Sequence, residues 1–386
     1  MPILSPSQAA EIARGVYDLR LNSVADALKT GIGTDGMFVV DDGSTFTGKT
    51  GALMFKKLST FGYVARGTGA FAGEVLIATR GTDMLPDWIT DANIGMQLGP
   101  SNHIVHAGFN TTWKGFVEDL RSFFRHNNPS RIHCVGHSLG GALATLNADF
   151  CTDQRIAAVE LYTFGCPRVG DGLFARSLTQ RVGAGSIRRV SHPADPVPMI
   201  PLFPFWHLPF GQPGMSIANV QGALVSGDAH KMRVSYLPGV REHSWSTLAP
   251  ATVAADEERQ VRNWLERAAE GHGGFVMGSA KLLTMIGRAL AWMMKAAGKA
   301  LLGGLGVTLA VGCTVLDQIA WLLTRAAQLG KEMGLALKSL INAIFAFLGR
   351  KTVATVDVST AFLRWVLELL FGALRAVAQR ALELVS

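Results

Sequence analysis

The chain has 386 residues, of which 48% are hydrophobic and 17% charged, and its formal net charge is +7. At ~150 residues per domain this length predicts two or three structural units, and the apolar composition excludes global disorder. Residues 1–273 carry 24 basic and 24 acidic side chains, whereas residues 274–386 carry 12 and 5, so the basic excess lies in the C-terminal stretch. Because that stretch is apolar and has no groove-reading motif, its charge indicates an anionic membrane surface rather than nucleic acid.

Helical and extended patterns alternate along the first 270 residues. The expected helices cover residues 7–29, 110–124, 139–150 and 253–269, and the expected strands cover residues 37–40, 62–65, 75–79, 132–135, 159–164 and 187–190. This alternation predicts an α/β fold with a largely parallel sheet. A glycine-rich break at 271–274 then separates a domain over residues 1–272 from an all-helical, apolar domain over residues 273–386.

The N-terminal residues and the cysteines bear on location and on metal binding. Residues 1–20 lack the basic head and long apolar run of a secretory signal peptide, so we expect synthesis in the cytoplasm and, for any export, a specialised route. The cysteines are scattered and form no CxxC pair, which favours reduced core residues over a metal site. They are Cys134, Cys151, Cys166 and Cys313.

The clearest chemical signal is a GxSxG motif, Gly136-His137-Ser138-Leu139-Gly140, between an expected strand and an expected helix. In that context the motif is typical of a nucleophile elbow, whose glycines let strand and helix approach closely. It predicts Ser138 as the nucleophile and the amide of Leu139 as a donor to an oxyanion. A plain Gly/Ser turn is the alternative for a bare match.

Around this motif the chain resembles the class 3 lipase family over roughly residues 8–250. The further blocks that carry the resemblance are VLIATRGTDMLPDWITDANI, VHAGF, YTFGCPRVGD and SHPADPVPMIP, in the family's order. The resemblance implies an α/β-hydrolase fold and assigns Thr82, in the RGT block, as the second oxyanion donor. Residues 83–97 follow where the family carries its lid, so either a small interfacial flap or ordinary packing is expected there. Residues 275–386 show no counterpart.

The acid of a serine triad should follow the nucleophile at the end of a later strand. Asp195 does so, because it comes after the expected strand at 187–190 and precedes Pro196, which stops the strand. Asp171 and Asp153 lie in turns with less strand before them. We therefore expect Asp195 to be the acid.

The base should follow the acid, which leaves four histidines. His230 is favoured because GDAHKMRVSYL resembles the family's H-S-M-x-x-Y-L block, although Lys231 stands where that block has serine. His243 is the rival, and the sequence leaves it open. His207 lies in an aromatic run typical of packing, and His272 falls in the linker.

With these roles, His230 would take the proton of Ser138 and the alkoxide would attack an ester carbonyl, with no cofactor or metal. We expect a serine hydrolase of lipid carboxylic esters that acts at a membrane surface. Phospholipid is expected ahead of triacylglycerol because a basic tail prefers anionic bilayers.

A second motif points to a different class of protein. Residues 43–50 satisfy GxxxxGK[ST] and follow the expected strand at 37–40, as a P-loop would. Gly51 comes next, however, and the following element is β-type and ends in the RGT block. A glycine-rich loop is therefore favoured over a P-loop NTPase.

The C-terminal stretch predicts membrane-seeking helices. The basic residues Lys281, Arg288 and Lys295 recur every seven positions, while the other faces are apolar, which is the pattern of an interfacial helix. Residues 300–316 are free of charge but fall short of the ~20 that span a bilayer. Further helices are expected over 318–348 and 359–384.

Three other interpretations of this stretch stay open. The helices could form a bundle packed on itself or on the hydrolase domain, or they could perturb membranes as a pore-forming unit with an accessory hydrolase. The architecture also resembles bacterial antibacterial lipase effectors, whose producers would need an immunity or chaperone protein as a partner.

Overall fold

The computed structural model describes residues 2–21, 34–40, 45–50, 57–81, 95–201, 205–217, 225–250, 257–269, 277–302, 315–351 and 358–383, and the structural statements below concern these residues.

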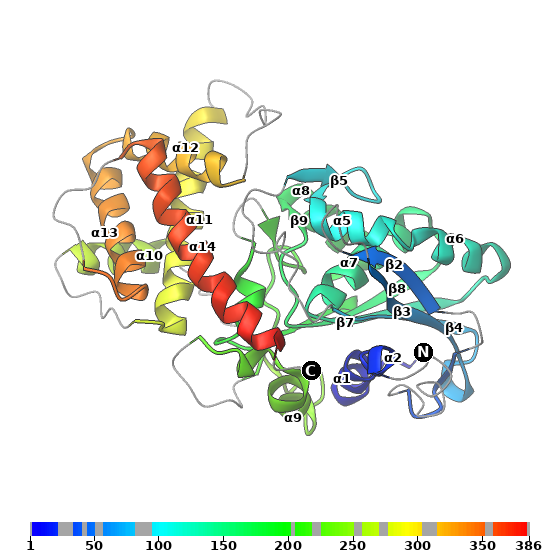
Figure 1. Ribbon diagram of the computed structural model, residues 1–386. Helices are drawn as coiled ribbons and strands as arrows, with labels where there is room; N and C mark the ends of the chain where they lie inside the picture. Colours follow the sequence, from blue (N-terminus) through cyan, green and yellow to red (C-terminus); the bar gives the residue numbers. More distant parts are fainter. Residues whose placement is uncertain are drawn as a thin grey trace.

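A nine-stranded mixed sheet forms the centre of the first part of the chain (Figure 1). Its middle is parallel, in the order β4 (Glu74–Thr79), β7 (Arg131–His137), β8 (Ala158–Phe164), β10 (Ile187–Ser191) and β12 (Met215–Ser216). Antiparallel strands close the two edges, namely β1 (Phe38–Val39), β2 (Thr45–Thr50), β3 (Lys57–Gly67) and β13 (Ala249–Pro250). The α/β fold with a largely parallel sheet is confirmed.

Both faces of this sheet are covered, which explains why its central strands read as continuous apolar runs. Along β7, Ile132 and Cys134 belong to one hydrophobic cluster and Val135 to the other, as the alternation of side chains in a strand requires. On the first face lie α5 (Ala107–Lys114), α7 (Leu139–Asp153) and α8 (Gly172–Val182), with α6 (Val117–His126) beyond α5. On the second face lie α1 (Pro6–Gly15) and α9 (Leu237–Val240).

The N-terminal helix is shorter than the sequence suggests. A capping box between Ser5 and Gln8 starts α1, which ends at Gly15 and is followed by the short α2 (Asp18–Leu21). The expected helix at 7–29 is thus two helices as far as the described residues reach.

A second, four-stranded sheet lies beside α5 and α8. It has the order β11 (Phe205–Trp206), β9 (Gly170–Asp171), β6 (Ile104–His106) and β5 (Met96–Leu98). All its pairings are antiparallel.

The helices after residue 256 pack together at one end of the molecule (Figure 1). They are α10 (Glu257–Ala269), α11 (Ala280–Leu302), α12 (Val315–Ala327), α13 (Lys331–Phe347) and α14 (Thr360–Glu383). The expected helix at 318–348 is two helices, because the backbone turns at Gly330, whose φ is +148°, before α13 begins. Helix α10 packs on α11 and α13, so it joins the helical group although the proposed boundary at 272/273 lies after it.

The apolar side chains of α11 face the other helices. Leu283, Ile286, Leu290 and Met293 are each less than 5% exposed. In this arrangement they form the core of a bundle, which matches the bundle interpretation, and they are not available to a membrane. Within the described residues, the helices include none with both the length and the apolar character needed to cross a bilayer.

Three buried imidazoles predict acid sensitivity of the fold. Burial lowers the pKa of His106 to about 3, and it also lowers the pKa of His133, although the hydrogen bond that His133 donates to Glu74 opposes the shift. The pKa of His137 lies well below its usual value because of burial and of the nearby His230. In the unfolded chain these groups take up protons near pH 6.5, so unfolding is coupled to proton uptake below that pH.

We therefore expect the free energy of unfolding to be unaffected by these groups above pH 7 and to fall from about pH 6.5 downward. The loss should reach about 1.4 kcal/mol per pH unit for each histidine. Denaturant titrations at several pH values measure it. A free energy that does not change between pH 7 and pH 5.5 would show that the three imidazoles are not held neutral.

Candidate active site

Ser138 occupies the turn between β7 and α7 in a strained conformation. Its φ is +58° and its ψ is −132°, in a region that non-glycine residues rarely adopt. A Cβ at Gly136 would lie 2.1 Å from the Gly140 carbonyl oxygen, and one at Gly140 would lie 2.2 Å from the Thr79 oxygen. Backbone therefore packs on backbone on both sides of the serine, which is the geometry of a nucleophile elbow.

The structure brings the three expected triad residues together. His230 Nε2 lies 2.8 Å from Ser138 Oγ, and His230 Nδ1 lies 2.8 Å from Asp195 Oδ2. All three residues are buried, with at most 2% of their surface exposed. One imidazole thus bridges a hydroxyl and a carboxylate, as a general base held by an acid must.

The acid is held by partners that the sequence did not indicate. The amide of Val197 donates to Asp195 Oδ1 at 2.8 Å, and the Tyr236 hydroxyl donates to Oδ2 at 2.6 Å. Burial and the carboxylate raise the pKa of Tyr236 well above its usual value, so its hydroxyl stays a donor. Tyr236 is the tyrosine of the sequence block that was used to choose His230. The block did not indicate that this tyrosine would bind the acid.

Gly165 is a second residue that sequence reasoning missed. It follows β8 with φ of +55°, and a Cβ there would lie 2.9 Å from Asp195 Oδ2 and 3.0 Å from His230 Nδ1. A side chain at this position would therefore push the acid and the base apart. The glycine in TFGCP predicts a turn, but the sequence does not show which side chains that turn will face.

Part of the expected oxyanion hole is described. Leu139 is the first residue of α7, so its amide has no partner within the helix and lies beside Ser138. Gly81, two residues after β4, is close by, because a Cβ on it would lie 3.6 Å from the Leu139 nitrogen and 3.5 Å from Ser138 Cβ. Thr82 lies outside the described residues, as does most of the expected lid segment.

The alternative acids and bases occupy other places. Asp171 caps α8 by accepting from the Phe174 amide, and Asp153 ends α7. His243 is exposed, with Thr247 Oγ1 3.4 Å from its Nδ1, while His230 makes both triad contacts. His272 lies outside the described residues.

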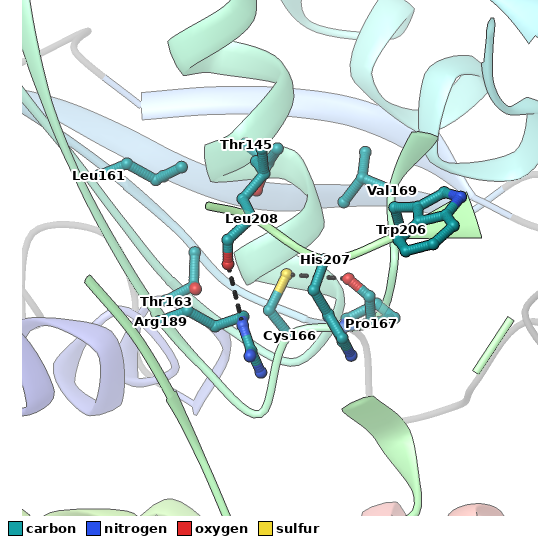
Figure 2. A pocket seen from close by; sticks show the side chains of 10 residues that line it. All are labelled: Thr145, Leu161, Thr163, Cys166, Pro167, Val169, Arg189, Trp206, His207 and Leu208. Carbon is teal, nitrogen blue, oxygen red and sulfur yellow. Dashed lines mark hydrogen bonds between the residues drawn. The ribbon is translucent and has the colours of Figure 1, made fainter. Parts of the chain in front are cut away.

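His207 lines a small cavity of about 10 Å³, together with Cys166 and Arg189 (Figure 2). Arg189 Nε donates to the Leu208 carbonyl there at 2.9 Å. Burial raises the pKa of the Cys166 thiol to about 12, so it stays protonated. The cavity is too small for a lipid and holds no activated nucleophile.

Metal-binding and P-loop geometry are not found in the described part of the chain. It contains no cluster of histidine, cysteine or acidic residues suited to a metal, and its cysteines Cys134, Cys151 and Cys166 are buried and unpaired with one another. Residues 45–50 of the GxxxxGK[ST] pattern form β2, antiparallel to β3. They are thus an extended strand, whereas a P-loop wraps around phosphate and leads into a helix.

The start of α11 touches the loops that carry the acid and the base. Ala280 forms a small buried cluster with Ala194 and Ala229, which precede Asp195 and His230, and Val225 packs against it. The Val225 amide also donates to the Gly278 carbonyl at 2.8 Å. The helical bundle is therefore docked on the candidate site.

Comparisons with known proteins find similarity to lipases over part of the chain. Residues 76–205 match the family described as Lipase (class 3). It is 34% identical over 157 residues to secreted mono- and diacylglycerol lipase 1 of Fusarium solani, covering 39% of this chain and 46% of that protein. It is 32% identical over 145 residues to the chloroplastic phospholipase A(1) DAD1 of Arabidopsis thaliana, covering 31% and 32%.

The chain spans about half the length of the mono- and diacylglycerol lipases that it matches. Among solved structures, lipase II from Rhizopus niveus matches with a TM-score of 0.42 and 24% identity, over 56% of this chain and 80% of that one.

The close backbone approach at the elbow predicts that Gly140→Ala destabilises the protein. The new methyl group would overlap the Thr79 carbonyl, so we expect a loss of about 3 kcal/mol, the upper end of overpacking effects. Gly185→Ala is the matched control, since a Cβ there meets nothing within 4 Å, and it should stay within about 0.5 kcal/mol. Thermal and denaturant unfolding of both variants decide the matter, and equal stabilities would contradict the elbow packing.

Proposed function

We propose that this protein is a carboxylic ester hydrolase that cleaves acyl lipids with Ser138 as nucleophile, His230 as base and Asp195 as acid. The observation that carries the proposal is the continuous hydrogen-bond chain from Ser138 through His230 to Asp195 in a strained elbow. The match of residues 76–205 to the family described as Lipase (class 3) supports it.

The geometry supports a two-step acyl transfer. His230 Nε2 accepts the Ser138 proton while Oγ attacks the ester carbonyl carbon, and Asp195 stabilises the imidazolium. The Leu139 amide, together with Thr82, would donate to the oxyanion. His230 then returns the proton to the alcohol, and water releases the fatty acid by the reverse sequence.

For the substrate we propose glycerolipids at an anionic surface, with phospholipid ahead of triacylglycerol. The relatives named above divide between mono- and diacylglycerol lipases and a phospholipase A(1), so they support a glycerolipid without choosing the headgroup. The preference for phospholipid rests on the basic excess of residues 274–386. Two exposed tryptophans on the bundle add to it: Trp321 lies under Arg325, and Trp365 lies under Arg350.

Delivery of the protein and further roles of the bundle are separate proposals. An accessory membrane-perturbing role would require the buried face of α11 to open. Export by a specialised route, with an immunity or chaperone partner, rests on architecture alone, since the relatives named above are a fungal and a plant enzyme. Growth of cells that express the chain in the periplasm, compared with cells that express Ser138→Ala, tests the toxin interpretation.

Ser138→Ala should abolish hydrolysis of a short soluble ester while the protein stays folded. His230→Ala should cause a similar loss, because removing triad members from serine hydrolases costs about 10⁴- to 10⁶-fold in kcat. His243→Ala, on the exposed segment, is the matched control and should keep nearly all activity. Steady-state kinetics with circular dichroism of each variant measure this. Turnover retained by folded Ser138→Ala would refute the mechanism.

The bundle surface predicts where an anionic membrane binds. Replacing Trp321 and Trp365 by serine should weaken binding to phosphatidylglycerol vesicles by at least about tenfold, because two large apolar side chains are lost. Hydrolysis of a soluble ester should not change. Added salt should weaken vesicle binding of the unaltered protein, because exposed charges are screened beyond ~10 Å at 0.1 M.

Trp206→Ser is the matched control for this surface, since Trp206 is also exposed but lies on β11 of the hydrolase part. It should leave vesicle binding unchanged. If Trp206→Ser lost vesicle binding and the double variant kept it, the membrane would bind the hydrolase part instead of the bundle.

A further inference from the structure

A second chain of hydrogen bonds reaches the candidate site from the N-terminal helix. The Gly81 amide donates to the Tyr17 hydroxyl at 3.2 Å, and that hydroxyl lies 3.0 Å from His137 Nδ1. On the other side of the ring, His137 Nε2 lies 2.7 Å from the carbonyl oxygen of His230. The acyl-transfer steps above use neither Tyr17 nor His137.

The direction of each bond follows from its partners. The His230 carbonyl can only accept, so the proton of the neutral His137 ring is on Nε2. His137 Nδ1 is then an acceptor, so the Tyr17 hydroxyl donates to it and accepts from the Gly81 amide. Burial and the neighbouring His230 hold the pKa of His137 well below its usual value, which agrees with a neutral ring.

This chain joins two parts of the site that must keep their relative position. At one end, Gly81 precedes Thr82, the expected second oxyanion donor, and lies beside Ser138 and Leu139. At the other end, the bond from His137 holds the main chain of His230, whose ring lies 4.5 Å from the ring of His137. The two ends are joined through one tyrosine hydroxyl and one imidazole.

We propose that Tyr17 and His137 are positioning residues, which fix the main chain of His230 relative to the end of β4 and thus align the base with the oxyanion donors. This inference rests on the proposed hydrolase function. Neither side chain touches the reacting atoms in this role, so their loss should lower kcat and leave KM almost unchanged. Small misplacements of catalytic groups can cost about 100-fold in rate.

A second series of hydrogen bonds, also made by a histidine of β7, provides a matched control. Four residues before His137, His133 Nδ1 lies 3.4 Å from the Tyr162 hydroxyl, which accepts from the Leu4 amide at 3.2 Å. This is the same order of amide, tyrosine and imidazole, although Tyr162 is fully buried whereas Tyr17 is only partly buried. It lies away from the candidate triad, because His133 forms a hydrogen bond with Glu74 and not with a triad residue.

The test compares Tyr17→Phe, His137→Leu, their double variant, His137→Gln and Tyr162→Phe in the full chain. Rates on a short soluble ester and melting temperatures are measured for each. Tyr17→Phe and His137→Leu should each lower kcat by about 10- to 100-fold, with KM within twofold. The double variant should be no slower than the slower single variant, because each single substitution already breaks the same series of hydrogen bonds.

Two further arms separate positioning from general destabilisation. His137→Gln, whose amide can both donate and accept, should recover at least a third of the kcat that His137→Leu loses. Tyr162→Phe should lower the melting temperature about as much as Tyr17→Phe but keep kcat within twofold.

The proposal is overturned if Tyr17→Phe keeps its kcat, if the two losses multiply in the double variant, or if Tyr162→Phe loses as much kcat as Tyr17→Phe. In those cases the unaltered protein still turns over ester, so the proposed function stands. If the unaltered protein shows no turnover, both proposals fail together.

Discussion

The contact between bare backbones at the elbow is the constraint on which the rest of this structure depends. Strand β7, helix α7 and the end of β4 meet where Gly136 and Gly140 leave no room for a Cβ. That approach holds Ser138 in a conformation that costs free energy, on the order of 1–3 kcal/mol, and the buried sheet and helix around it maintain the strain. Because β4 ends against the same turn, Gly81 comes to lie beside Ser138.

The sequence indicated the residues of the candidate triad better than the residues that hold them in place. Ser138, Asp195 and His230 could be chosen because each follows a recognisable strand or block and the chain order of such triads is known. Tyr236 and Gly165 could not, because their importance is a distance to Asp195 that arises only when separate loops meet. Tyr17 is a clearer case: it follows an ordinary amphipathic helix, and nothing in that helix points to a histidine 120 positions away.

The C-terminal helices show a different limit of sequence patterns. The periodicity of residues 281–299 predicted helix α11 correctly, because an apolar face repeats at the helical period whatever it contacts. A helix with this periodicity can pack its apolar face on a lipid surface or on a neighbouring helix. The pattern therefore could not predict that Ile286 and Met293 would be buried among other helices. The break at Gly330 was missed because apolar residues continue on both sides of it.

The docking of α11 on the candidate site affects how variants of the helical part must be interpreted. Ala280 lies outside residues 76–205, which match the lipase family, yet it packs with the alanines that precede the proposed acid and base. A larger side chain at residue 280 would displace those loops without touching Ser138 or any lipid. Lost activity after a change in the bundle therefore does not by itself identify a lipid-binding residue, and hydrolysis of a soluble ester has to be measured beside every vesicle assay.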